Sequence, residues 1–437
     1  MSKRLADEFG QMFEGYRSPA ARGSVVKASA RADAFGAEAH GFSVGGEKAG
    51  NHLVPECSFQ QWLRPLYDKG PAPPAKIGDH PDFVHLSGTQ LVEFSGITSL
   101  FMDLAGSTRL SRMLPLEEVF RIKNAVIRCA IEVVRAFDGH VHRIMGDAVF
   151  AFFGSKNGSR EQGVIDGLNC ASVLALAVKT VIVPALGDEN LGVRIGLDYG
   201  ADKDVLWSSY GYPGVNEVTA TSFNVDVAAK LQQSAGRNKV MIGQSLKTFL
   251  DFPECLLSTK QVTRDGVAHD EPFVLPNYTD KDGRKINYRQ FELDVDGYLA
   301  VSPLAGSLPE AANVPHVVVS VHNEKGGPAA STLVPTGVAV AKERWLRFHV
   351  RAPGVLSLPL RVDFEVENHG DEASSAGKAL GTPFANHSTS YKPDASFNGV
   401  GLEHWESTAY RGLHFQRVAV FSGDRRVSQG RFGVYVV

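Results

Sequence analysis

Between residues 91 and 250, apolar and polar positions predict strands and helices in alternation. The apolar run 97–102 ends at Asp103 and predicts a buried strand. In the segment 116–137, Val119, Ile122 and Val126 recur at helical spacing, and Pro115 suits the first turn of that helix. The remaining predicted elements are helical sequence from residue 109, a hairpin at 139–153, a helix at 161–186, a strand at 192–199, a helix at 223–235 and a strand at 239–242. Such alternation predicts an α/β or α+β sandwich.

After residue 309 the pattern changes, and helix-period runs are replaced by short runs of β type separated by Gly, Pro, Asn and Ser. The runs are 316–322, 345–350, 360–367, 414–421 and 433–437. This spacing is typical of an all-β sandwich. The loop 368–399 is long, and loops of that length are often functional.

Two linkers divide the chain. The proline cluster from Lys69 to Lys76 resembles a connector, and the segment 301–309 holds two prolines with Gly and Ser. We therefore predict an N-terminal extension of uncertain order over 1–90, a catalytic domain over 91–300 and a β-sandwich domain over 312–437.

Composition narrows the class of protein. The chain has 437 residues, 43% hydrophobic and 21% charged, which is ordinary soluble composition. A net charge of -3 gives no electrostatic reason to expect nucleic acid as a partner. The four cysteines are scattered without a CxxC pair, which favours a reduced, cytoplasmic protein. No uninterrupted apolar run has the length that a membrane span needs, so no membrane association is expected.

Two aspartates carry the clearest chemistry. Asp103 ends the first buried strand, and Asp147 follows Gly146 at the tip of the predicted hairpin, from which its side chain can point back towards Asp103. Paired carboxylates of this kind hold divalent metals. The segment Gly106-Ser107-Thr108 opens a helix whose free N–H groups and positive dipole end suit a phosphate. The residues therefore predict a site for metal and triphosphate.

The flanks of both aspartates resemble the class III nucleotidyl cyclases, over about residues 91–250. Phe101-Met-Asp-Leu-Ala-Gly-Ser-Thr108 matches the first strand of that family, and Gly139-His-Val-His-Arg-Ile-Met-Gly-Asp147 matches its hairpin. The resemblance implies a ferredoxin-like α/β sandwich and an enzyme that forms a head-to-tail homodimer. It also implies two Mn²⁺ or Mg²⁺ ions per site, held by Asp103, Asp147 and the carbonyl of Leu104.

The family takes two further site residues from the partner subunit, and this chain departs from both. Where the family has an Asn that orients the ribose and an Arg at the α-phosphate, this chain has Asp226 and Lys230. Lysine can neutralise phosphate charge but cannot form a bidentate clamp. Asp226 and Lys230 face the same way on a helix, so a pair between them is the simplest compensation; an ordinary surface ion pair is the alternative.

Base selection in the family rests on positions that correspond to Arg143 and Thr219. Arginine is longer than the lysine of the purine cyclases and suits a smaller base with carbonyl acceptors, as uracil has. This feature and the C-terminal β-domain resemble the pyrimidine cyclases of bacterial Pycsar anti-phage systems, some of which carry a C-terminal sensor domain. The resemblance implies a second messenger made on infection and a downstream effector encoded nearby.

We therefore expect a uridylate cyclase that converts UTP to 3′,5′-cyclic UMP and pyrophosphate, with CTP as the next substrate. Two other hypotheses remain open. One is an adenylate or guanylate cyclase with an unusual pocket. The other is a catalytically degenerate nucleotide-binding module, which the loss of the family Asn and Arg favours and the retention of both metal carboxylates opposes.

Overall fold

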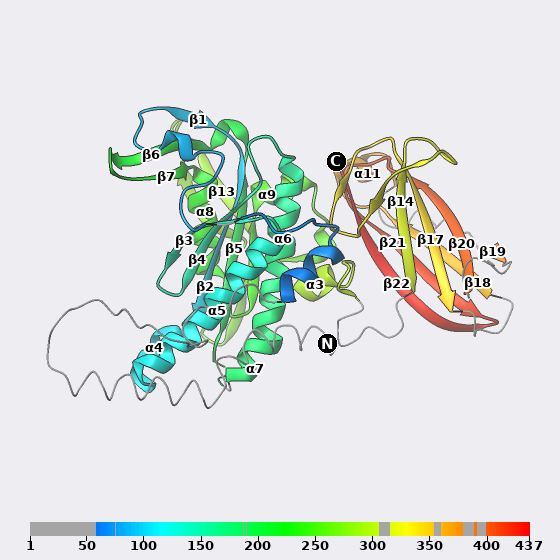
Figure 1. The fold of residues 1–437 in the computed structure, drawn as a ribbon, viewed down its shortest axis with the longest axis horizontal. Coiled ribbons are helices and arrows are strands. Elements are labelled where there is room, and N and C mark those ends of the chain that lie inside the picture. Colours follow the sequence, from blue (N-terminus) through cyan, green and yellow to red (C-terminus); the bar gives the residue numbers. More distant parts are fainter. Residues whose placement is uncertain are drawn as a thin grey trace, which may run out of the picture.

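The structure is a computed structural model that describes residues 58–305, apart from 75, 187 and 189, and residues 315–437, apart from 354–359, 379–388 and 391–398. Residues 1–57 of the predicted N-terminal extension lie outside the described residues, as does most of the long loop at 368–399. Figure 1 shows two units, with helices packed around a sheet in residues 58–305 and two further sheets in the C-terminal residues.

A mixed sheet forms the centre of the first unit. Its strand order is β12-β13-β8-β5-β2-β4-β3, with β9 paired to β13. The strands are β2 (Ile97–Ala105), β3 (His140–Met145), β4 (Ala148–Phe153), β5 (Gly192–Gly200), β8 (Lys239–Gly243), β9 (Leu257–Ser258), β12 (Phe273–Thr279) and β13 (Lys285–Leu293). Strand β2 is antiparallel to both of its neighbours, β4 and β5, and β5 runs parallel to β8.

Helices cover both faces of this sheet. They are α4 (Ser107–Met113), α5 (Leu116–Ala136), α6 (Arg160–Ala177), η2 (Val178–Ile182), α7 (Val183–Leu186), α8 (Phe223–Ser234), α9 (Gln244–Leu250), η4 (Glu254–Leu256) and α10 (Val295–Leu299). Leu100, Met102 and Leu104 of β2 join the core under α5 and α6. Asp103 lies on the opposite face, where Gln232 of α8 reaches it. The period-two pattern of β2 thus points its carboxylate away from the main core.

Helix α6 is buried on all sides. Together with η2 it spans Arg160–Ile182, which is long and apolar enough to cross a membrane by length and composition. However, 89% of its most apolar window is buried inside the protein, and this burial identifies it as a core helix. It packs against β2, β4 and β5 on one side and against α5, α9 and α10 on others.

The residues before β2 pack on this core. Helix α3 (Ser58–Leu66) lies against α5, and Phe59 and Leu63 join the main core. The ammonium of Lys69 is 2.9 Å from the carboxylates of both Asp138 and Asp166. Burial raises the pKa of Asp166 to about 6, and Lys69 offsets part of that rise. The described part of the predicted extension is therefore held by both apolar and charged contacts.

A small sheet stands beside the central one. It has the order β1-β6-β7, from β1 (Val92–Phe94), β6 (Leu206–Tyr212) and β7 (Val215–Thr221), and lies at the upper left of Figure 1. Two short 3-10 helices flank it, η1 (Val84–Leu86) and η3 (Asp202–Asp204). A separate hairpin joins β10 (Gln261–Arg264) to β11 (Val267–Asp270). Sequence periodicity predicted neither of these small sheets.

The C-terminal unit is a β-sandwich. One sheet has the order β15-β14-β17-β20 and the other β16-β22-β21-β18-β19. The elements are β14 (His316–His322), β15 (Ala329–Leu333), β16 (Ala339–Val340), β17 (Trp345–Pro353), β18 (Leu360–Glu367), α11 (Asp371–Ser375), β19 (Thr389–Ser390), β20 (Gly399–Ser407), β21 (Gly412–Ser422) and β22 (Arg425–Val436). Phe348 from one sheet and Phe364 from the other share its core.

The sandwich docks on α6 through buried polar contacts. Asn169 Nδ2 donates to Thr336 O at 2.8 Å, and Tyr298 Oη donates to Asn169 Oδ1 at 3.0 Å. Tyr435 Oη donates to Tyr298 Oη at 3.1 Å, and Tyr435 belongs to the same hydrophobic core as α6. Because these side chains have no access to water, each hydrogen bond must be made within the protein. The main core of the first unit therefore continues into the sandwich, which also has a core of its own.

Most predicted elements agree with the structure. The strand at 97–103, the hairpin, the helix at 223–235 and four of the five C-terminal β runs lie within three residues of β2, β3–β4, α8 and the sandwich strands. The fifth run, 433–437, covers only the end of β22, which begins eight residues earlier at Arg425. The predicted helix 161–186 contains a π-helical segment at η2, and the helical sequence from residue 109 divides at Pro115 into α4 and α5. The α+β fold class is confirmed.

The buried contact at Asn169 gives a first prediction. Asn169→Ala should lower the free energy of unfolding by about 2–4 kcal/mol, because Thr336 O and Tyr298 Oη would both be left buried without this partner. Tyr435→Phe removes one donor only and should cost about 1 kcal/mol. Urea unfolding of the full chain measures both. Equal stability of Asn169→Ala and the parent would contradict the proposed role of this contact.

Candidate active site

Asp103 and Asp147 lie at one end of adjacent strands. The β2–β4 ladder ends with Met102 opposite Val149, so both aspartates lie just beyond the last registered pair, Asp103 by one residue and Asp147 by two. Asp147 sits in the β3–β4 turn after Gly146, whose φ of 67° is the left-handed conformation that glycine tolerates. The structure therefore places both carboxylates at the same end of the sheet, as the sequence predicted.

Each carboxylate already faces a cation of the same chain. Arg194 Nη2 donates to Asp103 Oδ2, and Gln232 Nε2 lies 3.5 Å from the same oxygen. Lys123 Nζ is 3.6 Å from Asp147 Oδ1. Asp147 Oδ2 is buried without a hydrogen-bond partner in the described chain. An unsatisfied carboxylate oxygen at the same end of the sheet as a second carboxylate fits a divalent cation such as Mg²⁺ or Mn²⁺.

The described residues contain no group of three or more His, Cys, Asp and Glu side chains that could hold a metal ion. A metal at Asp103 and Asp147 would therefore need further oxygen ligands from elsewhere. The sequence-predicted ligand Leu104 is in β2, opposite Val193, with its side chain in the core and only its carbonyl available as an oxygen donor. Backbone carbonyls, water and phosphate oxygens are ligands that Mg²⁺ accepts.

The predicted phosphate segment begins α4. Gly106 is its N-cap with φ 84°, and a Cβ there would lie 2.7 Å from Asn190 O, so glycine is required by both conformation and space. Ser107 is buried and Thr108 is exposed. The N-cap residue has no side chain that could accept a hydrogen bond from the first N–H groups of α4.

Asp226 and Lys230 lie on α8 and are exposed. The pair expected between them is not formed, because the ion pairs and hydrogen bonds of the described chain include none that joins them. Gln232, two residues after Lys230, reaches Asp103. Side chains two positions apart differ by about 200° around the axis of a helix, so Lys230 points to another side of α8. Within one chain, Lys230 is therefore directed away from Asp103.

A buried network fixes α8. Asp198 of β5 accepts hydrogen bonds from Tyr288 Oη at 2.6 Å, Asn224 Nδ2 at 2.9 Å and Leu246 N at 3.2 Å. Burial raises the pKa of Asp198 to about 6, although these donors favour the charged form. Asn224 is therefore part of the buried network. It does not take the place of the asparagine that the family has at the position of Asp226.

Arg143 and Thr219 lie on β3 and β7. Arg143 forms an ion pair with Glu217, in which Nε donates to Oε1 at 2.8 Å and Nη2 donates to Oε2. Thr219 is half-buried two residues further along β7 and so lies on the same face of that strand as Glu217. The expected base-reading arginine thus has a carboxylate partner that the sequence analysis did not include.

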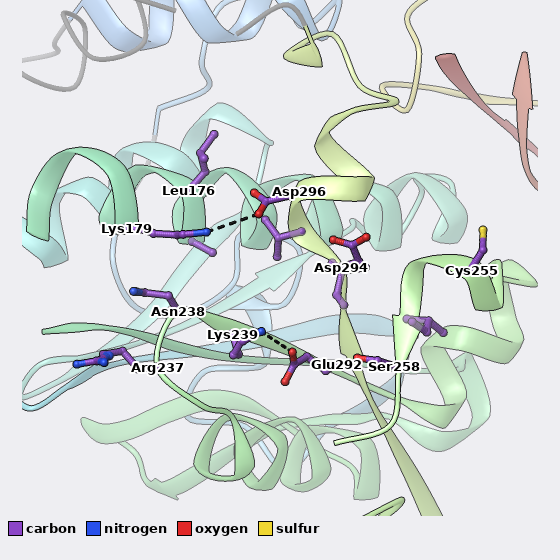
Figure 2. A pocket seen from close by; sticks show the side chains of 14 residues that line it. Leu176, Lys179, Arg237, Asn238, Lys239, Cys255, Ser258, Glu292, Asp294 and Asp296 are labelled. Atoms are coloured by element: carbon purple, nitrogen blue, oxygen red, sulfur yellow. Dashed lines mark hydrogen bonds and ion pairs between the residues drawn. The ribbon is translucent and has the colours of Figure 1, made fainter. Parts of the chain in front are cut away.

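A crevice of about 620 Å³ lies at the same end of the sheet, between η2, β8, β13 and α10, and Figure 2 shows side chains that line it. It adjoins the candidate site, because Lys239 on its wall is the neighbour of Arg194 in the β5–β8 ladder. Four of its charged side chains form two ion pairs: Lys239 Nζ is 2.6 Å from Glu292, and Lys179 Nζ is 3.5 Å from Asp296. None of the predicted site residues lines it, so it is not the triphosphate site of one chain.

The sequence analysis missed Arg194, Glu217, Gln232 and Asp198. Arg194 and Asp198 did carry a signal, because a charged residue inside the otherwise apolar run 192–199 needs a buried partner or a function. Glu217 and Gln232 carried none, since their partners are distant in the sequence.

Comparison with known proteins adds the family. Residues 310–437 match the family described as the Adenylyl/Guanylyl and SMODS C-terminal sensor domain. A cytidylate cyclase of Escherichia coli is 36% identical over 397 residues, covering 86% of this chain and 82% of the relative. A cytidylate cyclase of Staphylococcus aureus is 31% identical, covering 86% and 87%. A uridylate cyclase of Burkholderia cepacia is 26% identical over 165 residues, covering 36% of this chain and 68% of the relative.

The similarities to the two cytidylate cyclases extend over most of both chains and establish the class as nucleotide cyclases of class III. The chain belongs to the family of class III cyclases that includes these cytidylate and uridylate cyclases. The recognition made from the flanks of Asp103 and Asp147 is confirmed.

The raised pKa of Asp198 predicts a pH dependence. A carboxyl with a higher pKa in the folded state than its value of 3.8 when unfolded stabilises the fold most below pH 4, and this stabilisation is lost as pH rises through 6. Asp198→Asn removes that loss, so the stability of the variant relative to the parent should rise by up to about 3 kcal/mol between pH 4 and pH 7.

Urea unfolding at several pH values measures this difference. Asp282→Asn, at an exposed turn, is the control and should show no such rise. A flat difference for Asp198→Asn would show that the carboxyl does not titrate in this range.

Proposed function

We propose that this chain is a cytidylate cyclase, which converts CTP to 3′,5′-cyclic CMP and pyrophosphate. The observation that carries the proposal is the meeting of Asp103 and Asp147 at one end of β2 and β4, with one carboxylate oxygen unsatisfied. The relatives that match most of the chain are named cytidylate cyclases, which favours CTP. UTP, which the sequence analysis placed first, is the second candidate, because Arg143 can also donate to a carbonyl of uracil.

In the reaction, the ribose 3′-oxygen attacks the α-phosphorus, the bond to the β-phosphate oxygen breaks, and the 3′-hydroxyl proton is released. Two Mg²⁺ or Mn²⁺ ions, bound by Asp103, Asp147 and the Leu104 carbonyl, would supply positive charge for the triphosphate and acidify the hydroxyl. Arg194 would exchange Asp103 for a phosphate oxygen, since its side chain is partly exposed beside that carboxylate. The first N–H groups of α4 at Gly106, Ser107 and Thr108 would bind further phosphate oxygens.

Lys230 would stabilise charge at the α-phosphate, and Asp226 would orient the ribose or that lysine. Both would act from the second subunit of a homodimer, because Lys230 points away from Asp103 of its own chain. Exposed apolar side chains on the small sheet support such an interface: Phe94 on β1 and Tyr212 and Val215 on the β6–β7 turn are more than 60% exposed.

We further propose the division into a catalytic domain over 91–300 and a sensor domain over 312–437, in a cytoplasmic protein. The match to a sensor-domain family supports a role in which the sandwich detects a trigger. The cyclic nucleotide would then be a second messenger of anti-phage defence that activates an effector protein encoded nearby. The part of the N-terminal extension from Ser58 would stabilise the catalytic domain through its contacts with α5.

The substrate is tested by incubating the purified full chain with each of the four ribonucleoside triphosphates and Mn²⁺, and identifying products by mass. We expect cyclic CMP as the main product. Asp103→Asn should lower kcat by about a hundredfold or more, since a lost metal ligand removes several kcal/mol of charge stabilisation.

Asp424→Asn, at the exposed β21–β22 turn, is the control and should keep full activity. Cyclic AMP or cyclic GMP as the main product would contradict the pyrimidine assignment. The absence of any product would favour the degenerate nucleotide-binding module, and full activity of Asp103→Asn would remove Asp103 from the site.

A site shared between subunits predicts complementation. Asp103→Asn and Lys230→Ala homodimers should each be inactive, because every site lacks one group. Co-expression of the two chains should restore about a quarter of the parent activity, since half of the dimers would be mixed and each would contain one intact site. Measurement of cyclic nucleotide formation by the co-purified mixture checks this. No recovery in a mixture shown to contain mixed dimers would place both residues in the same chain's site.

A further inference from the structure

The guanidinium of Arg143 is fixed by Glu217. Two of its N–H groups, on Nε and Nη2, donate to the two oxygens of one carboxylate. This bidentate arrangement sets the plane of the guanidinium as well as its position. The two residues come from different sheets, β3 and β7, and their side chains are 42% and 37% exposed, so the pair faces open space that a ligand can enter.

Both strands hold this pair in place. The β3–β4 ladder has a register shift between Val141 and Arg143, and such bulges re-aim the side chains that follow. The backbone of β7 next to Glu217 is tied by Val218 N, which donates to Asp79 Oδ1 at 2.9 Å. His142 lies behind the pair, with Nδ1 donating to Gly78 O and Nε2 3.4 Å from Glu217 Oε1. The orientation of Arg143 is therefore built into the fold.

This orientation leaves one edge of Arg143 free. A guanidinium has five N–H groups, and Glu217 takes the two on the Nε/Nη2 side. The remaining edge presents parallel N–H donors from Nη1 and Nη2. In the described part of the chain, Nη1 has no hydrogen-bond partner. A ligand in this site would therefore face two adjacent hydrogen-bond donors, on Nη1 and Nη2 of Arg143.

Two adjacent donors discriminate between the pyrimidines. Cytosine offers O2 and N3 as neighbouring acceptors, so it can receive both hydrogen bonds from the fork. Uracil offers O2, then the N3–H donor, then O4, so the fork can make one hydrogen bond and sets its second N–H against another N–H. A mismatch that leaves a polar group unpaired is the kind that a site rejects strongly. The free edge of Arg143 thus suits cytosine.

We infer that Glu217 is a specificity-determining positioning residue, which selects cytosine over uracil by fixing the edge of Arg143 that meets the base. The inference rests on the proposed cyclase function and names the feature that separates its two candidate substrates. Without the carboxylate, the guanidinium could turn and offer single donors to the separated carbonyls of uracil.

The test is a competition assay on the full chain. Equal concentrations of CTP and UTP are supplied in one reaction with Mn²⁺, and the ratio of cyclic CMP to cyclic UMP is measured by mass spectrometry. The ratio is independent of how much enzyme is folded, so a purely structural effect of a variant does not move it. The parent should favour cyclic CMP, and Glu217→Gln should lower the ratio by about tenfold, the discrimination that one bidentate contact provides.

Glu217→Asp is the second variant, because it keeps a carboxylate but shortens the side chain; it should give an intermediate ratio even if Glu217→Gln has no turnover. Glu403→Gln is the control, since Glu403 also pairs with an arginine, Arg347, but on the sandwich, and its ratio should equal that of the parent. GTP is added in a separate competition, because O6 and N7 of guanine are also adjacent acceptors.

An active Glu217→Gln with an unchanged ratio would overturn the inference, as would parental ratios in Glu217→Asp or a parent enzyme that favours UTP. A preference of the parent for GTP would likewise overturn it. These results differ from failure of the proposed function, in which the parent enzyme forms no cyclic nucleotide from any triphosphate.

Discussion

The complete burial of α6 is the constraint on which the rest of the structure depends. A helix that is covered on every side has no water to satisfy its polar side chains, so their partners must come from the elements around it. Asn169 finds them in Thr336 of the sandwich and Tyr298 of α10, and Gln162 donates to Gly337 O at 2.8 Å. The same helix supports β2 and β5, which carry Asp103 and Arg194. The sandwich and the active-site strands therefore contact opposite sides of one rigid element.

The charged side chains of the candidate site are paired with one another. Asp103 is bound by Arg194, Asp147 faces Lys123, and Arg143 is bound by Glu217. The side chains in these pairs are between 19% and 42% exposed, and ion pairs near water contribute little net stability. Exchange of the Arg194 and Lys123 partners for metal and phosphate would therefore cost little free energy. Glu217 differs, because it competes with no substrate group for the free edge of Arg143.

The sequence was sufficient for the parts of the fold that depend on local pattern. The apolar run before Asp103 and the Gly146-Asp147 turn have their own signals, so β2, the hairpin and the meeting of the two aspartates were predicted. The small sheet of β1, β6 and β7 was not, because its strands leave apolar side chains such as Tyr212 and Val215 exposed, and the resulting pattern is not that of a half-buried strand. Glu217 was missed for a different reason, since its contact with Arg143 joins residues 74 positions apart.

The expected Asp226–Lys230 pair shows the limit of reasoning from helical spacing. Residues four apart on a helix share a face, but exposed side chains gain little from pairing when water solvates both. Their exposure has a different consequence once the opposite side of α8 is considered. Gln232 points into the chain's own site and Lys230 points out of it, so the same helix contributes to two places. In a dimer, a helix arranged in this way can support the site of its own chain and also contribute a residue to the site of the partner subunit. The two sites would then be coupled through α8. Because Asp198, Asn224 and Tyr288 lock that helix to β5, any displacement of α8 would move Lys230 of one site and Gln232 of the other together.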